Sequence, residues 1–339
     1  EGADGQKKMN QITRYFTVAL AAFNAITITV GLVNMSGTGG PVVPQANFLF
    51  HLTGVITLIT GTMIVMWLGE QITEYGIGNG ISLIIFAGII ARYPEGFINL
   101  FRTRFNSFSG VLISLAAIAV MVAVTAAIIF VTEAIRKIPV QYAKRIVGRK
   151  VYGGQSTYIP LRVNTAGVIP IIFAQSILMF PATLITLFQG GEAEAGTFWY
   201  SLRTMFTPGH WVYTIIYVGL IIFFAYFYTA LVLNPTEMAE NMVKYGGHIP
   251  GKKPGKKTAE YISSVLTRIT LPGAVFFAFV ALMPEMMTHI FKLPFYFGGT
   301  GLIIVVGVAL DTLRQIESHL VMRHYDGFMK KGKLRGRSS

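Results

Sequence analysis

The chain has 339 residues, of which 53% are apolar and only 13% are charged, and its mean hydropathy is positive. Soluble domains usually have about a quarter of their residues charged, so this composition excludes an ordinary soluble protein and indicates lipid as the solvent. The absence of cysteine excludes disulfides, thiolate metal sites and cysteine nucleophiles. The sequence begins at Glu1 without a cleavable signal pattern, and we expect it to start inside a longer protein.

Eight apolar segments are candidates for membrane-spanning helices, which need about 20 residues to cross the hydrocarbon core. The third and seventh are short, but the third can extend past Tyr75 and the seventh can begin near Val265. We therefore predict an all-α, polytopic membrane protein whose two ends lie on one side. In chain order the segments are 15–33, 48–68, 77–91, 111–131, 166–188, 212–233, 269–283 and 300–321.

Lysine and arginine are concentrated on one face of this topology. Of the 28 basic residues, 22 lie in the N-terminal segment, the loops after the fourth and sixth spans, and the tail. Five lie on the opposite face, and Arg314 lies inside the last span. The positive-inside rule makes the basic face cytoplasmic, so both ends of this chain are expected in the cytoplasm.

Two cytoplasmic loops are about 30 residues long, and such loops are usually functional or disordered. In the second loop, Asn234, Pro235 and Glu237 fit the N-cap, N1 and N3 positions of a helix. Gly246 and Gly247 fit its C-terminal stop. The Pro/Gly/Lys segment 248–257 that follows is too basic to be buried, and we interpret it as a projecting docking finger.

No pattern of catalytic, cofactor-binding or metal-binding residues is present in the sequence. The Gly-rich segment 76–80 connects two predicted membrane helices, so we interpret it as a tight interhelical turn and not as a phosphate loop. We therefore predict no catalytic residue, no metal and no cofactor. The six histidines show no metal-ligand spacing: His51, His210, His248, His289, His319 and His324.

An ion-coupled secondary transporter is the alternative function. Transporters place ionisable residues near the bilayer midplane, but seven of the eight spans contain no Asp, Glu, Lys or Arg. The exception is Asp311, with Arg314 three residues later. A salt-bridged pair facing a cytoplasmic vestibule explains these two residues better than an ion site.

Five segments together resemble the SecY family, the membrane channel of the general secretory pathway. The similarity is collinear over essentially all of the chain, and it corresponds to spans three to ten of that family's ten. The family's first two spans and plug helix are absent from this sequence. The segments are 67–82 (WLGEQITEYGIGNGIS), 142–163 (YAKRIVGRKVYGGQSTYIPLRV), 166–170 (AGVIP), 228–235 (YTALVLNP) and 294–300 (PFYFGGT).

The resemblance implies the central pore-forming subunit of the Sec translocon in the bacterial plasma membrane. Such a subunit conducts unfolded polypeptides, releases hydrophobic segments sideways into the lipid bilayer, and catalyses no covalent chemistry. It also implies that 1–98 belongs to the first half of the channel, and that 99–322 forms the second half with docking loops 133–164 and 234–268. Residues 323–339 would form a basic cytoplasmic tail.

Two sets of residues match pore and gate positions of the family. Branched aliphatic side chains offer a passing peptide no hydrogen bond, and a narrow apolar collar impedes ions by dewetting. Taken alone, each of these isoleucines is more typical of a lipid-facing or packed position, and an N-cap explains Asn164 as well as a gate position does. The pore-ring positions are Ile81, Ile85, Ile172 and Ile304, and the lateral-gate positions are Asn24, Asn164, Gln175 and Phe180.

The two basic loops match the family's docking surface for the SecA motor ATPase and the ribosome. The resemblance further implies SecE, SecG and substrate polypeptides with signal sequences as partners. Lys253 stands where the family usually has arginine, and Lys252 where it usually has an aliphatic residue. The docking residues are Lys144, Arg145, Arg149 and Lys150 in one loop, and Lys252, Lys253, Lys256 and Lys257 in the other.

Overall fold

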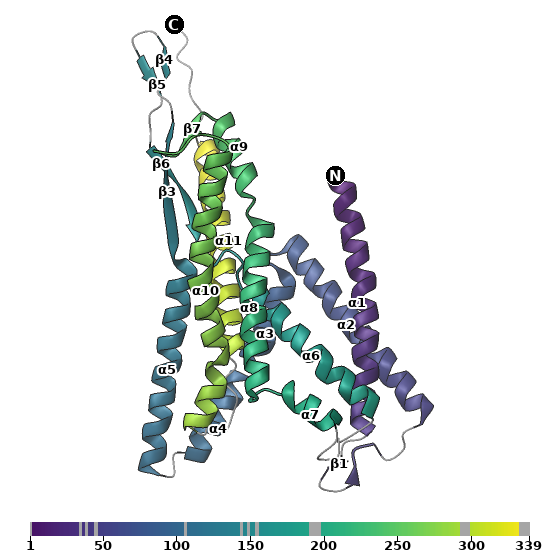
Figure 1. Ribbon diagram of the computed structural model, residues 1–339. Helices are drawn as coiled ribbons and strands as arrows, with labels where there is room; N and C mark the ends of the chain where they lie inside the picture. Colours follow the sequence, from purple (N-terminus) through teal and green to yellow (C-terminus); the bar gives the residue numbers. More distant parts are fainter. Residues whose placement is uncertain are drawn as a thin grey trace. The chain divides into compact units, whose positions relative to one another are not determined.

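The computed structural model contains two compact units (Figure 1). The first comprises residues 1–91, 179–207 and 308–339, and the second comprises residues 92–178 and 208–307. Within them the structure describes residues 2–33, 36–37, 40–43, 47–104, 107–142, 145–147, 150–152, 156–189, 198–291 and 299–331.

A helix occupies each of the eight predicted spans, which confirms the all-α membrane fold. Seven stretches are long and apolar enough to cross a membrane, and an eighth, Ile169–Ile185, is shorter. The helices are α1 (Gly2–Val33), α2 (Phe48–Tyr75), α3 (Gly80–Ile90), α5 (Phe108–Glu133), α6 (Ile169–Gln189), α8 (Trp211–Val232), α10 (Lys256–Phe291) and α11 (Gly299–Lys331).

The expected extension of the third span past Tyr75 is wrong. The chain leaves the helix between Tyr75 and Gly80, because Gly78 adopts a φ of +92°, a conformation that glycine accepts without steric cost. The apolar stretch continues instead in the other direction, through the helix α4 (Tyr93–Arg104). The interpretation of 76–80 as a tight interhelical turn is confirmed.

In the first unit, α1 and α2 pack against each other as a helical hairpin. Gly54 allows the close approach, since a Cβ added there would lie 2.7 Å from Cγ2 of Thr29. Toward the other end of the hairpin, Arg14 donates to both carboxylate oxygens of Glu70, at 3.0 and 2.7 Å. The described residues of this unit also include the strands β1 (Ser36–Gly37) and β2 (Gly40–Pro41) and the helix α7 (Phe198–Met205).

In the second unit, α10 packs beside α8, as Figure 1 shows. The Tyr226 hydroxyl on α8 donates to the carbonyl oxygen of Thr267 on α10 at 3.0 Å. A separate apolar cluster joins α4, α5 and α10 through the buried side chains of Leu100, Ala117 and Met287.

The two long basic loops contain strands, which the sequence did not predict. Strand β3 (Ile135–Tyr142) pairs antiparallel with β6 (Ser156–Arg162) and with β7 (Gly247–His248), and β4 (Arg145–Val147) pairs with β5 (Lys150–Tyr152). The helix predicted in the second loop is confirmed as α9 (Pro235–Lys244). Asn234 is its N-cap, and the side-chain oxygen accepts from the amides of Thr236 and Glu237.

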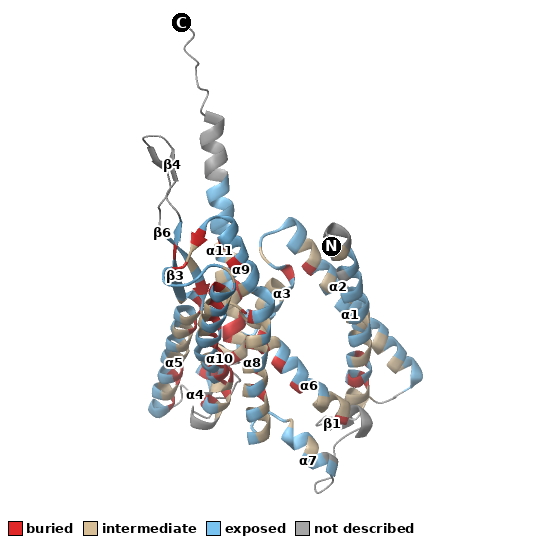
Figure 2. Cartoon of the chain, turned by 45° about the horizontal axis from the view of Figure 1, so that its top comes forward, coloured by how far each residue is buried: buried red, intermediate tan, exposed pale blue. Residues whose placement is uncertain are grey.

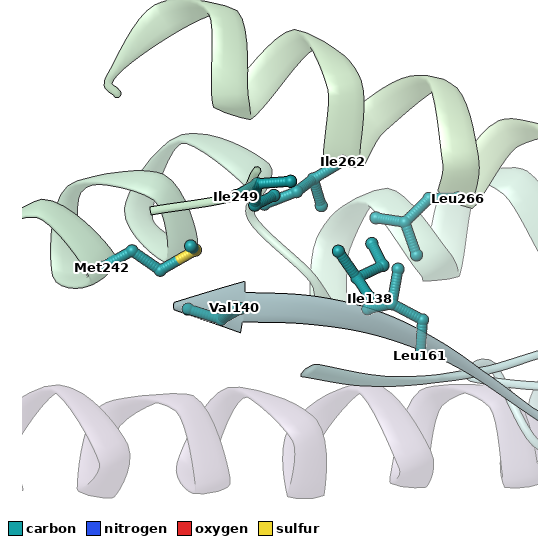
Figure 3. Packing of buried hydrophobic residues seen from close by; sticks show 7 residues of the cluster. All are labelled: Ile138, Val140, Leu161, Met242, Ile249, Ile262 and Leu266. Carbon is teal, nitrogen blue, oxygen red and sulfur yellow. The ribbon is translucent and has the colours of Figure 1, made fainter. Parts of the chain in front are cut away.

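A buried apolar cluster fastens these strands to the membrane helix α10. Figure 3 shows side chains of β3 facing α9 and α10. Alternation along β3 turns Ile138 and Val140 to the same side, because successive side chains in a strand point to opposite faces. The cluster consists of Ile138, Val140, Leu161, Met242, Ile249, Ile262 and Leu266.

Many residues along the membrane helices are exposed (pale blue in Figure 2), and large apolar side chains are among them. The most apolar stretches of α2 and α3 contain no buried residue, whereas 44% of the corresponding stretch of α10 is buried. Soluble proteins rarely leave extended apolar surface in water, so these helices are suited to contact lipid or further protein.

Candidate functional site

The first two pore-ring residues lie on one face of α3, at the edge of a large cavity. Ile81 and Ile85 are four residues apart, and their exposed fractions are 50% and 38%. Both line an open cavity of about 990 Å³ between α1, α2 and α3, which we term the α1–α3 cavity. The remaining lining is mixed, with Trp67 and Val65 beside Arg14, and the cavity is therefore wide, open and only partly apolar.

The other two pore-ring residues belong to the second unit. Ile172 is half-buried on α6, and Ile304 is only 8% exposed on α11. The start of α6 packs closely against α11 near these residues. A Cβ added to Gly307 on α11 would lie 2.5 Å from Cγ1 of Val168, the residue before α6. The structure thus brings Ile81 and Ile85 onto one cavity, and it places Ile172 and Ile304 on adjoining segments of the other unit.

Two gate residues lie at a contact between α1 and α6 in the first unit. The rings of Phe23 and Phe180 are 5.6 Å apart between centroids, and Asn24 is the exposed neighbour of Phe23. This contact joins the third and seventh spans in the family's count. Phe23 was not singled out in the sequence, although its position next to Asn24 was a usable signal. Gln175 is exposed on α6, in the part assigned to the second unit.

Asn164 lies in the turn before α6 and not at the start of the helix. The alternative that Asn164 caps this helix is wrong, because α6 begins five residues later, at Ile169. Asn164 instead lines a small crevice of about 20 Å³ together with residues of α8 and α10, among them Thr229 and Thr270. Its polar side chain therefore lies at the junction of three helices.

The basic docking residues are only partly within the described chain. Lys252, Lys253, Lys256 and Lys257, which we term the lysine tip, are all exposed. Lys252 lies over the ring of Tyr261, with Nζ 5.1 Å from the ring centroid. The tip is not a free loop, because the adjacent Ile249 is buried in the apolar cluster.

In the other loop, the structure places Arg145 and Lys150 in the paired strands β4 and β5. Lys144 and Arg149 lie outside the described residues. The docking role of this loop therefore stays a prediction.

The charged pair of the last span is confirmed as an ion pair. Nη1 of Arg314 lies 3.4 Å from Oδ1 of Asp311. The bidentate pair of Arg14 and Glu70 was missed, although the two residues lie at similar distances from the connection between α1 and α2. Among the described residues there is no group of three or more His, Cys, Asp or Glu that could hold a metal ion.

Comparisons with known proteins identify the class of membrane protein. A family model described as SecY matches residues 1–313. The protein translocase subunit SecY of Escherichia coli K12 is 47% identical over 337 residues, covering 99% of this chain and 75% of that protein. The corresponding subunit of Rickettsia conorii is 48% identical over 335 residues, covering 99% and 76%.

Solved structures show the same fold. One is a SecY protein studied for its plug domain, with a TM-score of 0.68 and 18% identity, covering 94% of this chain and 76% of that chain. Another is Sec61 in the canine ribosome–channel complex, with a TM-score of 0.56 and 17% identity, covering 90% and 71%.

The fold and the family match define a protein-conducting channel of the membrane. The chain belongs to the SecY family. It is a multi-pass protein of the bacterial plasma membrane and the pore-forming subunit of a protein translocase, which passes unfolded polypeptides across the membrane and hydrophobic segments into it. The ion-coupled transporter alternative is therefore wrong.

Proposed function

We propose that Ile81, Ile85, Ile172 and Ile304 form the constriction through which the polypeptide passes. The observation that carries this proposal is the position of Ile81 and Ile85 on the wall of the α1–α3 cavity, with their side chains exposed instead of packed. A wide and partly polar cavity that ends at branched aliphatic side chains admits an unfolded chain and holds it without hydrogen bonds. The same side chains exclude ions by dewetting.

The lateral gate in this proposal lies where α1 meets α6. The contact of Phe23 with Phe180 is one aromatic pair, and such pairs contribute only about 0.5 to 1.5 kcal/mol. Asn24, next to Phe23, is suited to interhelical hydrogen bonding, which is weak within membranes. A signal sequence that packs between the helices can replace these interactions, so the seam stays closed at rest and opens for a substrate.

The basic loops and the tail would face the cytoplasm, with both ends of this chain on that side, as the positive-inside rule requires. The two halves of the channel would divide near residue 98. We propose SecA or the ribosome as the source of energy and SecE and SecG as membrane partners. The chain itself catalyses no covalent step in this proposal.

The experiment that tests the constriction uses the cysteine-free background. Single substitutions Ile81→Cys, Ile85→Cys, Ile172→Cys and Ile304→Cys are introduced in the assembled translocon, and a polypeptide with one cysteine is stalled during passage. We expect disulfide crosslinks at these positions and not at Leu83 or Ile303. Crosslinks confined to Leu83 and Ile303 would show that the pore positions are wrong.

A further inference from the structure

Ile81 is held in place by a hydrogen-bonded junction between α2 and α3. The Thr73 hydroxyl on α2 donates to the carbonyl oxygen of Gly69 at 2.8 Å, one turn earlier in the same helix. The hydroxyl oxygen of Thr73 in turn accepts a hydrogen bond from the backbone amide of Gly80, the first residue of α3, at 2.8 Å. One hydroxyl therefore links the backbone of α2 to the start of the helix that carries Ile81. We term Gly69, Thr73 and Gly80 the Thr73 bridge.

The two glycines of the bridge permit this approach. A Cβ added to Gly80 would overlap the carbonyl oxygen of Gly69, and it would lie 2.8 Å from Cβ of Ile72. A Cβ added to Gly69 would lie 2.8 Å from Cγ1 of Ile81 and 3.3 Å from the amide nitrogen of the same residue. The Ile81 side chain thus rests directly on the backbone of α2.

Two further contacts restrict the start of α3. Asn79 caps the helix, and its side-chain oxygen accepts from the amide of Ser82 at 3.1 Å. Gly78, with a φ of +92°, brings the turn against α11, where an added Cβ would lie 3.4 Å from Oγ1 of Thr312. The turn is therefore fixed on both sides, and Ile81 has little freedom to move independently of α2.

We propose that Thr73 is a positioning residue for the pore: through the Thr73 bridge it sets the height and direction of Ile81, and of Ile85 one turn later. The inference rests on the proposed function of these two isoleucines. The hydroxyls of Thr60 and Thr62, also on α2, donate to the carbonyl oxygen four residues earlier. The Thr73 hydroxyl differs because it also accepts a hydrogen bond from the backbone amide of Gly80, at the start of α3.

The test compares Thr73→Val, Thr73→Ser and Thr60→Val in the assembled translocon in liposomes. Valine keeps the shape of threonine and removes the hydroxyl, and Thr60→Val removes an equivalent hydroxyl from the same helix. Loss of one part-buried hydrogen bond shifts a two-state equilibrium by roughly two- to fivefold. We expect Thr73→Val to raise the resting ion leak by that factor, while Thr73→Ser and Thr60→Val retain the parental leak.

A crosslinking measurement separates this inference from the proposed function. In the parent channel Ile81→Cys should crosslink to a stalled polypeptide, and adding Thr73→Val should lower the yield by a similar factor. No crosslink in the parent overturns the pore position of Ile81, and this inference with it. A normal crosslink in the parent, with leak and yield unchanged by Thr73→Val, overturns the inference alone.

If Thr73→Val does not accumulate in the membrane, a second pair of variants tests the role of the Thr73 bridge. Gly80→Ala puts a methyl group into the bridge, whereas Gly88→Ala puts one on the same helix, where no atom lies within 4 Å. We expect Gly80→Ala alone to raise the leak. Equal leaks in the two alanine variants would overturn the role of the bridge.

Discussion

At the scale of single residues, the pair of Arg14 and Glu70 joins the two helices of the first hairpin. The arginine donates two hydrogen bonds in a bidentate arrangement, which lysine cannot reproduce. The pair also lies on the wall of the α1–α3 cavity, so its loss would affect the helix that carries Asn24 and the proposed gate.

Arg14→Gln should therefore lower the thermal stability of the purified channel, and Arg14→Lys should lower it less. The charge swap that combines Arg14→Glu with Glu70→Arg should restore part of the loss, because the opposite charges are again paired. The measurement is the unfolding temperature in detergent at low and high salt. A swap no more stable than either single variant would show that the pair does not hold the hairpin.

The capping residue Asn234 offers a second prediction at this scale. Removal of an N-cap side chain costs a helix about 1 kcal/mol, so Asn234→Ala should increase exchange of the α9 amides by about fivefold. Asn241→Ala, on the same helix but away from its start, is the control. The readout is hydrogen exchange by mass spectrometry, and equal exchange in both variants would contradict the capping role.

At the scale of elements, the lysine tip exposes its positive charges while the segment that leads to it is anchored by a buried apolar residue. Ile249 anchors the approach to the tip, and Lys256 and Lys257 already belong to the first turn of α10. Lysine is a point charge without a planar fork, so docking through this tip should depend on charge more than on paired hydrogen bonds.

Reversal of the charge at Lys252 and Lys253 to Glu should weaken binding of SecA or the ribosome at least tenfold at moderate salt, an order of magnitude set by several lost ionic contacts. Membrane assembly should be unaffected, because the tip lies outside the spans. Lys244→Glu, on the exposed surface of α9, is the matched control. Equal binding by all variants in a salt series would reduce the tip to a topology signal.

The helices and the cap of α9 were predictable because they depend on local sequence. The start of α9 is indicated by residues within four positions of one another, Asn234 to Glu237. Each membrane span is indicated by the apolar residues of a single helix. The strands were not predictable, because Pro139 and Pro160 interrupt both long strand segments. The structure tolerates Pro139 because β7 reaches only Gln141 and Tyr142, so the proline lies where β3 has a single neighbour.

The candidate site also contains features that the local sequence predicts and features that depend on the three-dimensional structure. The position of Ile81 and Ile85 on one face follows from helical periodicity and was predictable. The Thr73 bridge was not predictable, because Thr73 and Gly80 lie on different helices and their contact depends on the shape of the turn between them. The aromatic contact of Phe23 with Phe180 joins segments that are far apart in the sequence.

At the scale of the whole molecule, the asymmetry of basic residues predicts the orientation in the membrane. Reporters fused after Lys150, Lys253 and Lys333 should remain cytoplasmic, and reporters near Gly40, Arg102 and Gly191 should be external, since 22 basic residues lie on the first face and five on the second. Enzymatic reporters active on only one side of the membrane provide the measurement. A single reporter on the wrong side would contradict the arrangement of spans.

The long helix α10 connects the lysine tip to the membrane-spanning part of the chain. Its 36 residues extend about 54 Å, well beyond a hydrocarbon core of about 30 Å. The helix is therefore long enough to continue from the lysine tip through the membrane. Two prolines lie inside the helix, Pro272 and Pro284, and each removes a helical hydrogen bond. Gly273, the residue after Pro272, presses against Val163, with an added Cβ only 3.1 Å from the Val163 carbonyl oxygen. If a motor binds the lysine tip as proposed, its force would travel along this helix to the contact with Val163, next to Asn164.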